Sequence, residues 1–415
     1  MKQLLLIIAV ISILSLIFSC KKENIDNTSG EFKQVNLTEK QKQLINTSNA
    51  FGFEFFKKVT EISGAETNMM VSPLSVSMAL GMTRNGAANG TLEAMTNTLG
   101  FAGMSDTAIN ESYKYIIETF SGLDPKVKLQ IANSIWYHNA FNVEQAFIQA
   151  NQQYFDASVT PLDFSSPTAV QLINDWVNEK TNMLIPKVID EIPAEAVMYL
   201  INAVYFKGQW KYQFEKDKTE QKSFYLYNGT ELQVASMTQH ETLPFYSGSG
   251  FTAVELPYNQ GNYVMSILLP DAGKTVSDVI TQLSQANWNT WSTQFSHKDI
   301  QLQLPKFKYE YNEKQMKPIL SDMGMGVAFD PNNADFTRIN SDGGLYISRV
   351  IHKTYIETNE EGTEAAAVTA VEVGVTSVGP DQTYYFTINR PFVYFIQEKS
   401  TGTILFIGTV MNPNL

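Results

Sequence analysis

The first hydrophobic pattern in the folded region has a helical period. Five apolar side chains recur at spacings that place them on one face of a helix: Leu44, Phe51, Phe55, Val59 and Ile62. Thr38 and Gln41 have the spacing of a capping box, and Gly64 is a residue type that commonly ends helices. The pattern therefore predicts a long amphipathic helix between Thr38 and Gly64.

Later in the chain the apolar pattern changes to strand type. Ile300, Leu302 and Leu304 alternate with polar residues, whereas residues 263–269 and 404–410 are short apolar runs. Alternation is typical of a strand buried on one face, and a short apolar run is typical of a fully buried strand. Helical patterns gather in the first half and strand patterns in the second, which favours an α+β fold over regular βαβ alternation.

The segment from Glu360 to Gln382 has a period of two. One face carries small, β-branched or hydroxyl side chains: Thr363, Ala365, Ala367, Thr369, Val371, Val373 and Val375. The other face carries Glu364, Ala366, Val368, Ala370, Glu372 and Gly374. This is a half-buried strand pattern, longer than the about 5 to 6 residues of a typical strand. Residues 364–367 are also good helix formers, but the valines and threonines that follow favour a strand.

Composition narrows the possible partners. The chain has 415 residues, 44% of them hydrophobic, and no repeat or linker interrupts residues 38–415, so one large domain is expected. Lysine and arginine total 30 against 42 acidic residues, which gives a formal charge of -12. This charge argues against nucleic-acid binding, and the absence of a basic patch argues against activation by a polyanion.

The N-terminus has the character of an export signal. Lys2 precedes an apolar run from Leu4 to Phe18, shorter than the roughly 20 residues that a membrane-spanning helix needs. Residues 17–20 resemble a bacterial lipoprotein box, which implies a signal peptide at 1–19 and a lipid on Cys20, the only cysteine. An ordinary secretory signal with an incidental cysteine is the alternative.

Residues 21–36 are polar and rich in turn formers, so 20–36 is expected to be a lipidated tether. The expected location is then outside the cytoplasm, anchored by lipid to the bacterial envelope. The outer membrane and the cell surface are candidate sites.

Catalytic motifs are missing from the sequence. The four histidines, His138, His240, His297 and His352, do not have metal-ligand spacing, and no G-x-S-x-G, Walker or G-x-G-x-x-G motif occurs. The sequence therefore indicates neither an enzyme, nor a metal site, nor a cofactor.

Residues 352–370, HKTYIETNEEGTEAAAVTA, resemble the hinge of the serpin family. Other serpin-like stretches follow in the family's order: residues 68–75, 202–210, 304–307, 334–336, 390–392 and 412–413. The resemblance implies helices packed on a large mixed central sheet, two further sheets and an exposed reactive-centre loop. It places the serpin domain at 37–415 and the loop at about 360–382.

The resemblance also implies a function. Serpins offer the loop to a protease, and cleavage lets the upstream half of the loop insert as a new strand, which traps the protease as an acyl-enzyme. The hinge positions match the inhibitory pattern: Glu360, Glu361, Gly362, Thr363, Glu364, Ala365, Ala366 and Ala367. A one-to-one covalent complex and an otherwise monomeric protein are expected. The alternative is a non-inhibitory serpin that serves as a binding or structural protein.

Two supporting sites follow from the same resemblance. Ser72, Ser75, Asn202 and His352 match the shutter, a buried hydrogen-bond cluster beneath the strands that separate. Glu360, Lys306 and Trp210 match the breach, the ion pair and aromatic lid where the loop first enters. These roles are structural rather than catalytic.

The family's spacing places the reactive bond at Thr376-Ser377. The downstream part of the loop is longer than usual, so Val373, Val375 and Val378 remain alternatives. Between Lys353 and Arg390 the chain has no lysine or arginine, which disfavours trypsin-like targets. Threonine or valine suits elastase-like and subtilisin-like serine proteases, and Val375 also suits papain-like cysteine proteases.

Overall fold

The computed structural model describes residues 31–64, 66–194, 196–363 and 383–415. Residues Phe32–Leu415 form one compact unit, which contains all the helices and strands discussed below. None of the helices in the described ranges combines the length and the apolar character needed to cross a lipid bilayer.

The first helix forms where the apolar period predicts it. Helix α2 spans Glu39–Ser63; the Thr38 hydroxyl accepts the backbone N–H of Gln41, and the Gln41 side chain accepts the N–H of Thr38. Gly64 follows with φ 81°. Ile62 was expected on the buried face but is 44% exposed.

The remaining helices are mostly short. They are α3 (Pro73–Arg84), α4 (Asn89–Thr98), α5 (Asp106–Phe120), α6 (Gln145–Phe155), α7 (Ala169–Lys180), η1 (Lys216–Lys218), α8 (Val276–Gln282), α9 (Gln285–Ser292), α10 (Met316–Leu320), η2 (Ser321–Met325) and η3 (Gly326–Phe329). Side-chain caps start several of them; in α3, for example, Ser72 accepts the N–H of Ser75 and Pro73 occupies the first turn.

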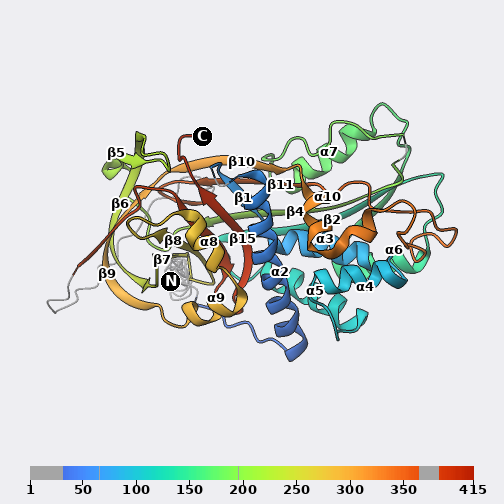
Figure 1. Ribbon diagram of the computed structural model, residues 1–415, viewed down its shortest axis with the longest axis horizontal. Coiled ribbons are helices and arrows are strands. Elements are labelled where there is room, and N and C mark those ends of the chain that lie inside the picture. The colour runs from blue at the N-terminus through green and yellow to red at the C-terminus, as the bar shows by residue number, and fades with distance from the viewer. Residues whose placement is uncertain (1–30, 65, 195, 364–382) are drawn as a thin grey trace, which may run out of the picture. The chain divides into compact units, whose positions relative to one another are not determined.

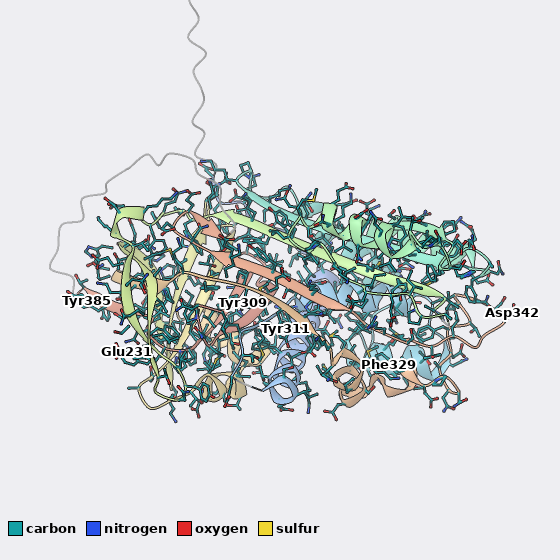
Figure 2. All side chains as sticks on the ribbon, turned by 90° about the horizontal axis from the view of Figure 1, so that it is seen from above. Glu231, Tyr309, Tyr311, Phe329, Asp342 and Tyr385 are labelled. Atoms are coloured by element: carbon teal, nitrogen blue, oxygen red, sulfur yellow. The ribbon has the colours of Figure 1, made fainter. Side chains whose placement is uncertain are left out.

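Among the described residues, six strands form the central mixed sheet. In spatial order they are β10 (Phe307–Glu313), β11 (His352–Thr358), β12 (Gly362–Thr363), β4 (Met198–Gln209), β2 (Val127–His138) and β3 (Ser158–Leu162). Of the strand pairs that the structure describes in this sheet, only β2–β3 is parallel. Helix α7 packs on one face of this sheet through Ile173 and Val177, and α3 packs on the other, as the green and blue helices in Figure 2 show.

The other strands of the described ranges form a nine-stranded sheet. Their order is β1 (Met69–Val71), β15 (Thr403–Val410), β14 (Phe392–Glu398), β8 (Tyr263–Pro270), β7 (Phe251–Tyr258), β6 (Glu231–Ser247), β9 (Ser296–Pro305) and β13 (Tyr384–Thr387), with β5 (Glu220–Tyr225) also paired to β6. The α+β prediction is confirmed (Figure 1), and the two further sheets are continuous because β6 pairs with β9 over Ser236–Phe245 and with β7 over Phe245–Ser247.

Tyr309 on β10 connects the two sheets. Its hydroxyl lies 2.6 Å from the hydroxyl of Tyr394 on β14 and 3.1 Å from the carbonyl oxygens of Met69 and Thr409, which share its proton as acceptors. Figure 2 labels Tyr309 beside Tyr311 on the same strand. Both sheets therefore share one hydrophobic core around this residue.

Residues 33–36 belonged to the predicted tether, and the structure holds them against the folded domain. Lys33 exchanges two backbone hydrogen bonds with the side chain of Asn262, and the N–H of Val35 donates to Ser400. The Tyr115 hydroxyl donates to the carbonyl of Asn36. Any tether to a membrane would therefore end before Lys33.

Candidate functional site

A slot in the central sheet is the main feature of the candidate site. β12 pairs with β4 through Gly362–Gln209 and Thr363–Gly208, and with β11 through Thr358–Thr363. Within the described ranges, no other strand pairing joins β4 to β11. The facing edges of β4 and β11 beyond β12 therefore present backbone donors and acceptors that a further strand can pair with.

The chain enters this slot through a tight turn at Asn359–Gly362. The N–H of Asn359 donates to the carbonyl of Gly362 at 2.9 Å, and the Asn359 side chain accepts the N–H groups of Glu361 and Gly362. A Cβ atom at position 362 would lie 2.0 Å from the carbonyl oxygen of Gly208. Only glycine allows β12 to approach β4 this closely.

Aromatic side chains close the entrance around Thr363. The Thr363 hydroxyl lies 2.6 Å from the hydroxyl of Tyr258, and both residues are buried. Trp210 stacks on Tyr258 with ring centroids 4.5 Å apart, and its indole N–H donates to the carbonyl of Asn359 at 3.0 Å. Burial raises the pKa of Tyr258 well above its usual range, so the phenol remains a neutral hydrogen-bond partner.

Glu360 makes the ion pair that the sequence suggested. The Lys306 ammonium lies 3.0 and 2.9 Å from the two Glu360 carboxylate oxygens, and the Thr219 hydroxyl donates to one of them at 2.8 Å. Burial alone would raise the pKa of Glu360, but the hydrogen bonds from Lys306 and Thr219 lower it on balance. Glu360 is therefore ionised at neutral pH, and Lys306, Glu360 and Trp210 are all held at the turn.

The four shutter residues are only partly connected. The Nε2 atom of His352 accepts the N–H of Ser72 at 3.0 Å, and the Ser75 hydroxyl reaches the carbonyl of Asn202 at 3.5 Å. The Asn202 side chain donates to Asn133 instead of contacting His352, and its Oδ1 atom is buried without a partner among the described residues. Burial lowers the pKa of His352 to about 4, so the imidazole is neutral at neutral pH.

An apolar cavity of about 140 Å³ lies at the far end of the slot. It is lined by Met198 and Leu200 of β4, Leu80 of α3, and Ile347 and Ile351 of the segment that leads into β11. Apolar atoms make up the larger part of its walls, which suits aliphatic side chains, and Thr83, Ser348 and Arg349 also line it.

Several predicted site residues lie outside the described residues. They are Cys20, the hinge residues Glu364, Ala365, Ala366 and Ala367, and the candidate reactive positions Val373, Val375, Thr376, Ser377 and Val378. In the part of the chain that is described, no group of three or more His, Cys, Asp and Glu side chains is arranged to hold a metal ion.

Other residues at the turn were not singled out from the sequence. Asn359, Thr219, Tyr258 and Lys216 all contact residues 359–363. Asn359 lies next to the recognised hinge and was identifiable by proximity. The other three lie more than a hundred residues away, and no local pattern indicates their contacts.

Comparison with known proteins gives a consistent answer. A family model described as "Serpin (serine protease inhibitor)" matches residues 46–413. An uncharacterised serpin-like protein from Methanosarcina acetivorans is 31% identical over 88% of this chain and 85% of its own length. Leukocyte elastase inhibitor from Xenopus tropicalis is 32% identical over 88% of this chain and 97% of its own.

A solved structure agrees with these relatives. The thermophilic serpin tengpin in its native state superposes with a TM-score of 0.81 at 35% identity, covering 92% of this chain and 97% of tengpin. The chain belongs to the serpin family. Members of this family are generally protease inhibitors rather than catalytic enzymes, and they form covalent complexes with their target proteases.

Proposed function

We propose that this protein is a suicide inhibitor of proteases that works by inserting its cleaved loop between β4 and β11. The single observation that carries the proposal is the position of β12, which occupies the head of a slot whose two edges have no direct pairing in the described residues. Gly362 and Thr363, at the start of the loop, already lie between β4 and β11.

In the proposed inserted state, the loop would continue the register of β12. Continuing the Thr363–Gly208 pairing would set Thr369 opposite Asn202 and Val373 opposite Met198. Directly opposed residues in an antiparallel pair share a face. On β4, Leu200, Val204 and Phe206 pack against the main core, so the odd-numbered loop residues 365–373 would enter the core. Glu364 and Glu372 would take the other face, on which α7 packs.

Two features of the slot match the side chains assigned to it. Thr369 would lie between Asn202 and His352, where its hydroxyl would donate to the Oδ1 atom of Asn202, which has no partner among the described residues. Val371 and Val373 would reach the cavity lined by Leu200 and Met198. Each buried valine contributes about 1.5 to 3 kcal/mol and each backbone hydrogen bond about 0.5 to 1.5 kcal/mol. The uncleaved state would then be metastable and kinetically trapped.

The covalent step follows ordinary acyl transfer. The protease nucleophile attacks the carbonyl carbon of Thr376, the bond to Ser377 breaks, and the new Ser377 amine takes up the proton from the nucleophile. Insertion then pulls the acyl-enzyme away and distorts its active site before water can attack. Val373, Val375 and Val378 remain alternative positions for the cleaved bond.

The sequence of the loop supports one target class over another. The loop carries no basic side chain for a trypsin-like pocket, and its threonine and valine residues suit elastase-like or subtilisin-like serine proteases. Papain-like cysteine proteases are a further candidate through Val375. The similarity to leukocyte elastase inhibitor supports the first of these classes.

The proposal places the inhibitor outside the cytoplasm as a monomer. Export by the signal at 1–19 and lipid attachment at Cys20 would anchor the domain to the bacterial envelope. The supporting observation is the apolar run before the only cysteine. Labelling with a radioactive fatty acid, compared between wild type and Cys20→Ala, tests this part of the proposal.

A protease panel tests the inhibitory mechanism. Elastase, subtilisin, papain and trypsin are each mixed with the protein, and a complex that survives SDS is expected with elastase or subtilisin. Mass spectrometry of the peptide freed under denaturing conditions identifies the cleaved bond. Thr363→Arg places a charge in the buried contact with Tyr258 and should convert the inhibitor into a substrate.

Thr293→Arg is the matched control, because Thr293 is exposed and follows the C-terminal end of α9, away from the slot. This variant should inhibit like the wild type. Loop cleavage without any SDS-stable complex across the panel would contradict the proposal and favour a non-inhibitory binding or structural role.

A further inference from the structure

The connection from β4 to β5, residues 210–219, holds the hinge turn at several points. The N–H of Trp210 donates to the carbonyl of Glu361, and the N–H of Phe214 donates to the carbonyl of Glu360, each at 2.9 Å. The Thr219 hydroxyl donates to the Glu360 carboxylate. This connection therefore forms hydrogen bonds with both the backbone and a side chain of the turn.

Lys216 in the same connection binds the second hinge glutamate. Its ammonium lies 2.5 Å from Oε1 of Glu361. The Glu361 side chain is only 10% exposed, and its Oε2 atom is buried without a partner among the described residues. Since Glu361 depends on so few partners, removing Lys216 would leave a poorly solvated carboxylate at the turn.

The two adjacent glutamates are thus held by lysines from separate parts of the chain. Glu360 pairs with Lys306, between β9 and β10, whereas Glu361 pairs with Lys216 in η1. Because the two ion pairs hold consecutive residues, they fix the register in which the chain enters β12. This matters because a one-residue slip of a strand moves every side chain to the opposite face. A slip here would turn Glu364 towards the core.

We propose that Lys216 is a positioning residue for loop insertion: by pairing with Glu361 it fixes the register in which the loop enters between β4 and β11. This inference rests on the proposed inhibitory function. Lys216 touches neither the cleaved bond nor the protease, so its effect should appear after acylation. Loss of Lys216 would change the fraction of acyl-enzyme that is trapped by insertion rather than released by hydrolysis. It would not change the rate at which the protease attacks the loop.

The experiment measures the two steps separately. Lys216→Gln should raise the number of inhibitor molecules consumed per protease trapped about two- to fivefold, with little change in the rate of loop cleavage. Lys216→Arg keeps the charge and should restore the wild-type value. Lys222→Gln is the matched control, because it removes the same charge from a surface ion pair with Glu220 on β5.

A double variant shows whether Lys216 acts through Glu361. In a Glu361→Gln background, adding Lys216→Gln should have no further effect. The inference is overturned if Lys216→Gln consumes no more inhibitor than Lys222→Gln, or if its effect persists in the Glu361→Gln background.

Two measurements on the wild type, complex formation and heat resistance after cleavage, distinguish failure of this inference from failure of the proposed function. If the wild type forms no complex but gains heat resistance on cleavage, the inhibitory function fails. The rate at which the cleaved protein gains heat resistance, compared among Lys216→Gln, Lys216→Arg and Lys222→Gln, then decides the role of Lys216. If the cleaved wild type gains no heat resistance, no insertion occurs, and both proposals are wrong.

Discussion

At the scale of single residues, the burial of His352 makes the stability of the fold depend on pH. Its imidazole is buried and its pKa is lowered from 6.5 to about 4, so the unfolded chain binds a proton that the folded protein excludes. The contribution of neutral His352 to the free energy of unfolding is complete above the pKa of the unfolded chain, about 6.5. It is lost as the pH falls from about 6.5 towards 4. The loss is on the order of 3 kcal/mol.

We therefore expect His352→Gln, which retains an acceptor for the N–H of Ser72, to flatten the pH dependence of stability. The measurement is the thermal-unfolding midpoint between about pH 7 and about pH 4.5. His240→Gln is the control, because His240 is 54% exposed and pairs with Asp299 at the surface. Equal slopes for wild type and His352→Gln would show that His352 does not govern this dependence.

The sequence predicted some residue contacts and missed others. Lys306, Glu360 and Trp210 could be named through family resemblance, and the structure brings them together. Lys216 could not be named, because it lies in a run of alternating charges, Glu215 to Lys218, that is typical of a solvated turn. Only the fold reveals that one of these lysines reaches Glu361, 145 residues later.

At the scale of elements, the local pattern predicted the type of structure well. The capping box of α2 and the strands β8, β9 and β15 form where periodicity placed them. β12 was not predicted as a separate strand, because two residues carry no periodic signal. It forms through the tertiary contacts of Thr363 with Tyr258 and the close approach of Gly362 to Gly208.

β12 therefore provides a test at this scale. Gly362→Ala would place a Cβ against the backbone of Gly208, and overpacking of this kind commonly costs about 1 to 3 kcal/mol. We expect the rate at which the cleaved protein acquires heat resistance to fall about tenfold. Gly122→Ala is the control, because no atom lies within 4 Å of a Cβ at that position. An unchanged rate in Gly362→Ala would mean that insertion does not start from β12.

At the scale of the whole molecule, the open slot predicts a gain in stability on cleavage. Under the proposed mechanism, the inserted loop would add a full strand to the central sheet and bury valines of residues 365–373. The thermal midpoint should rise by roughly 10 °C or more after the loop is cut, as measured by differential scanning calorimetry. The thermal midpoint of Thr363→Arg should rise little after cleavage. An equal rise in that variant would show that the gain in stability does not depend on entry of the loop at β12.

The position of β14 and β15 has a consequence for the cleaved molecule. Both strands lie inside the nine-stranded sheet, β15 between β1 and β14, and β14 between β15 and β8. Every candidate cleavage point precedes β13, so the downstream fragment includes these strands. The cut protein is then two polypeptides in one particle. Gel filtration should show a single species of unchanged mass, whereas denaturation should release the C-terminal fragment.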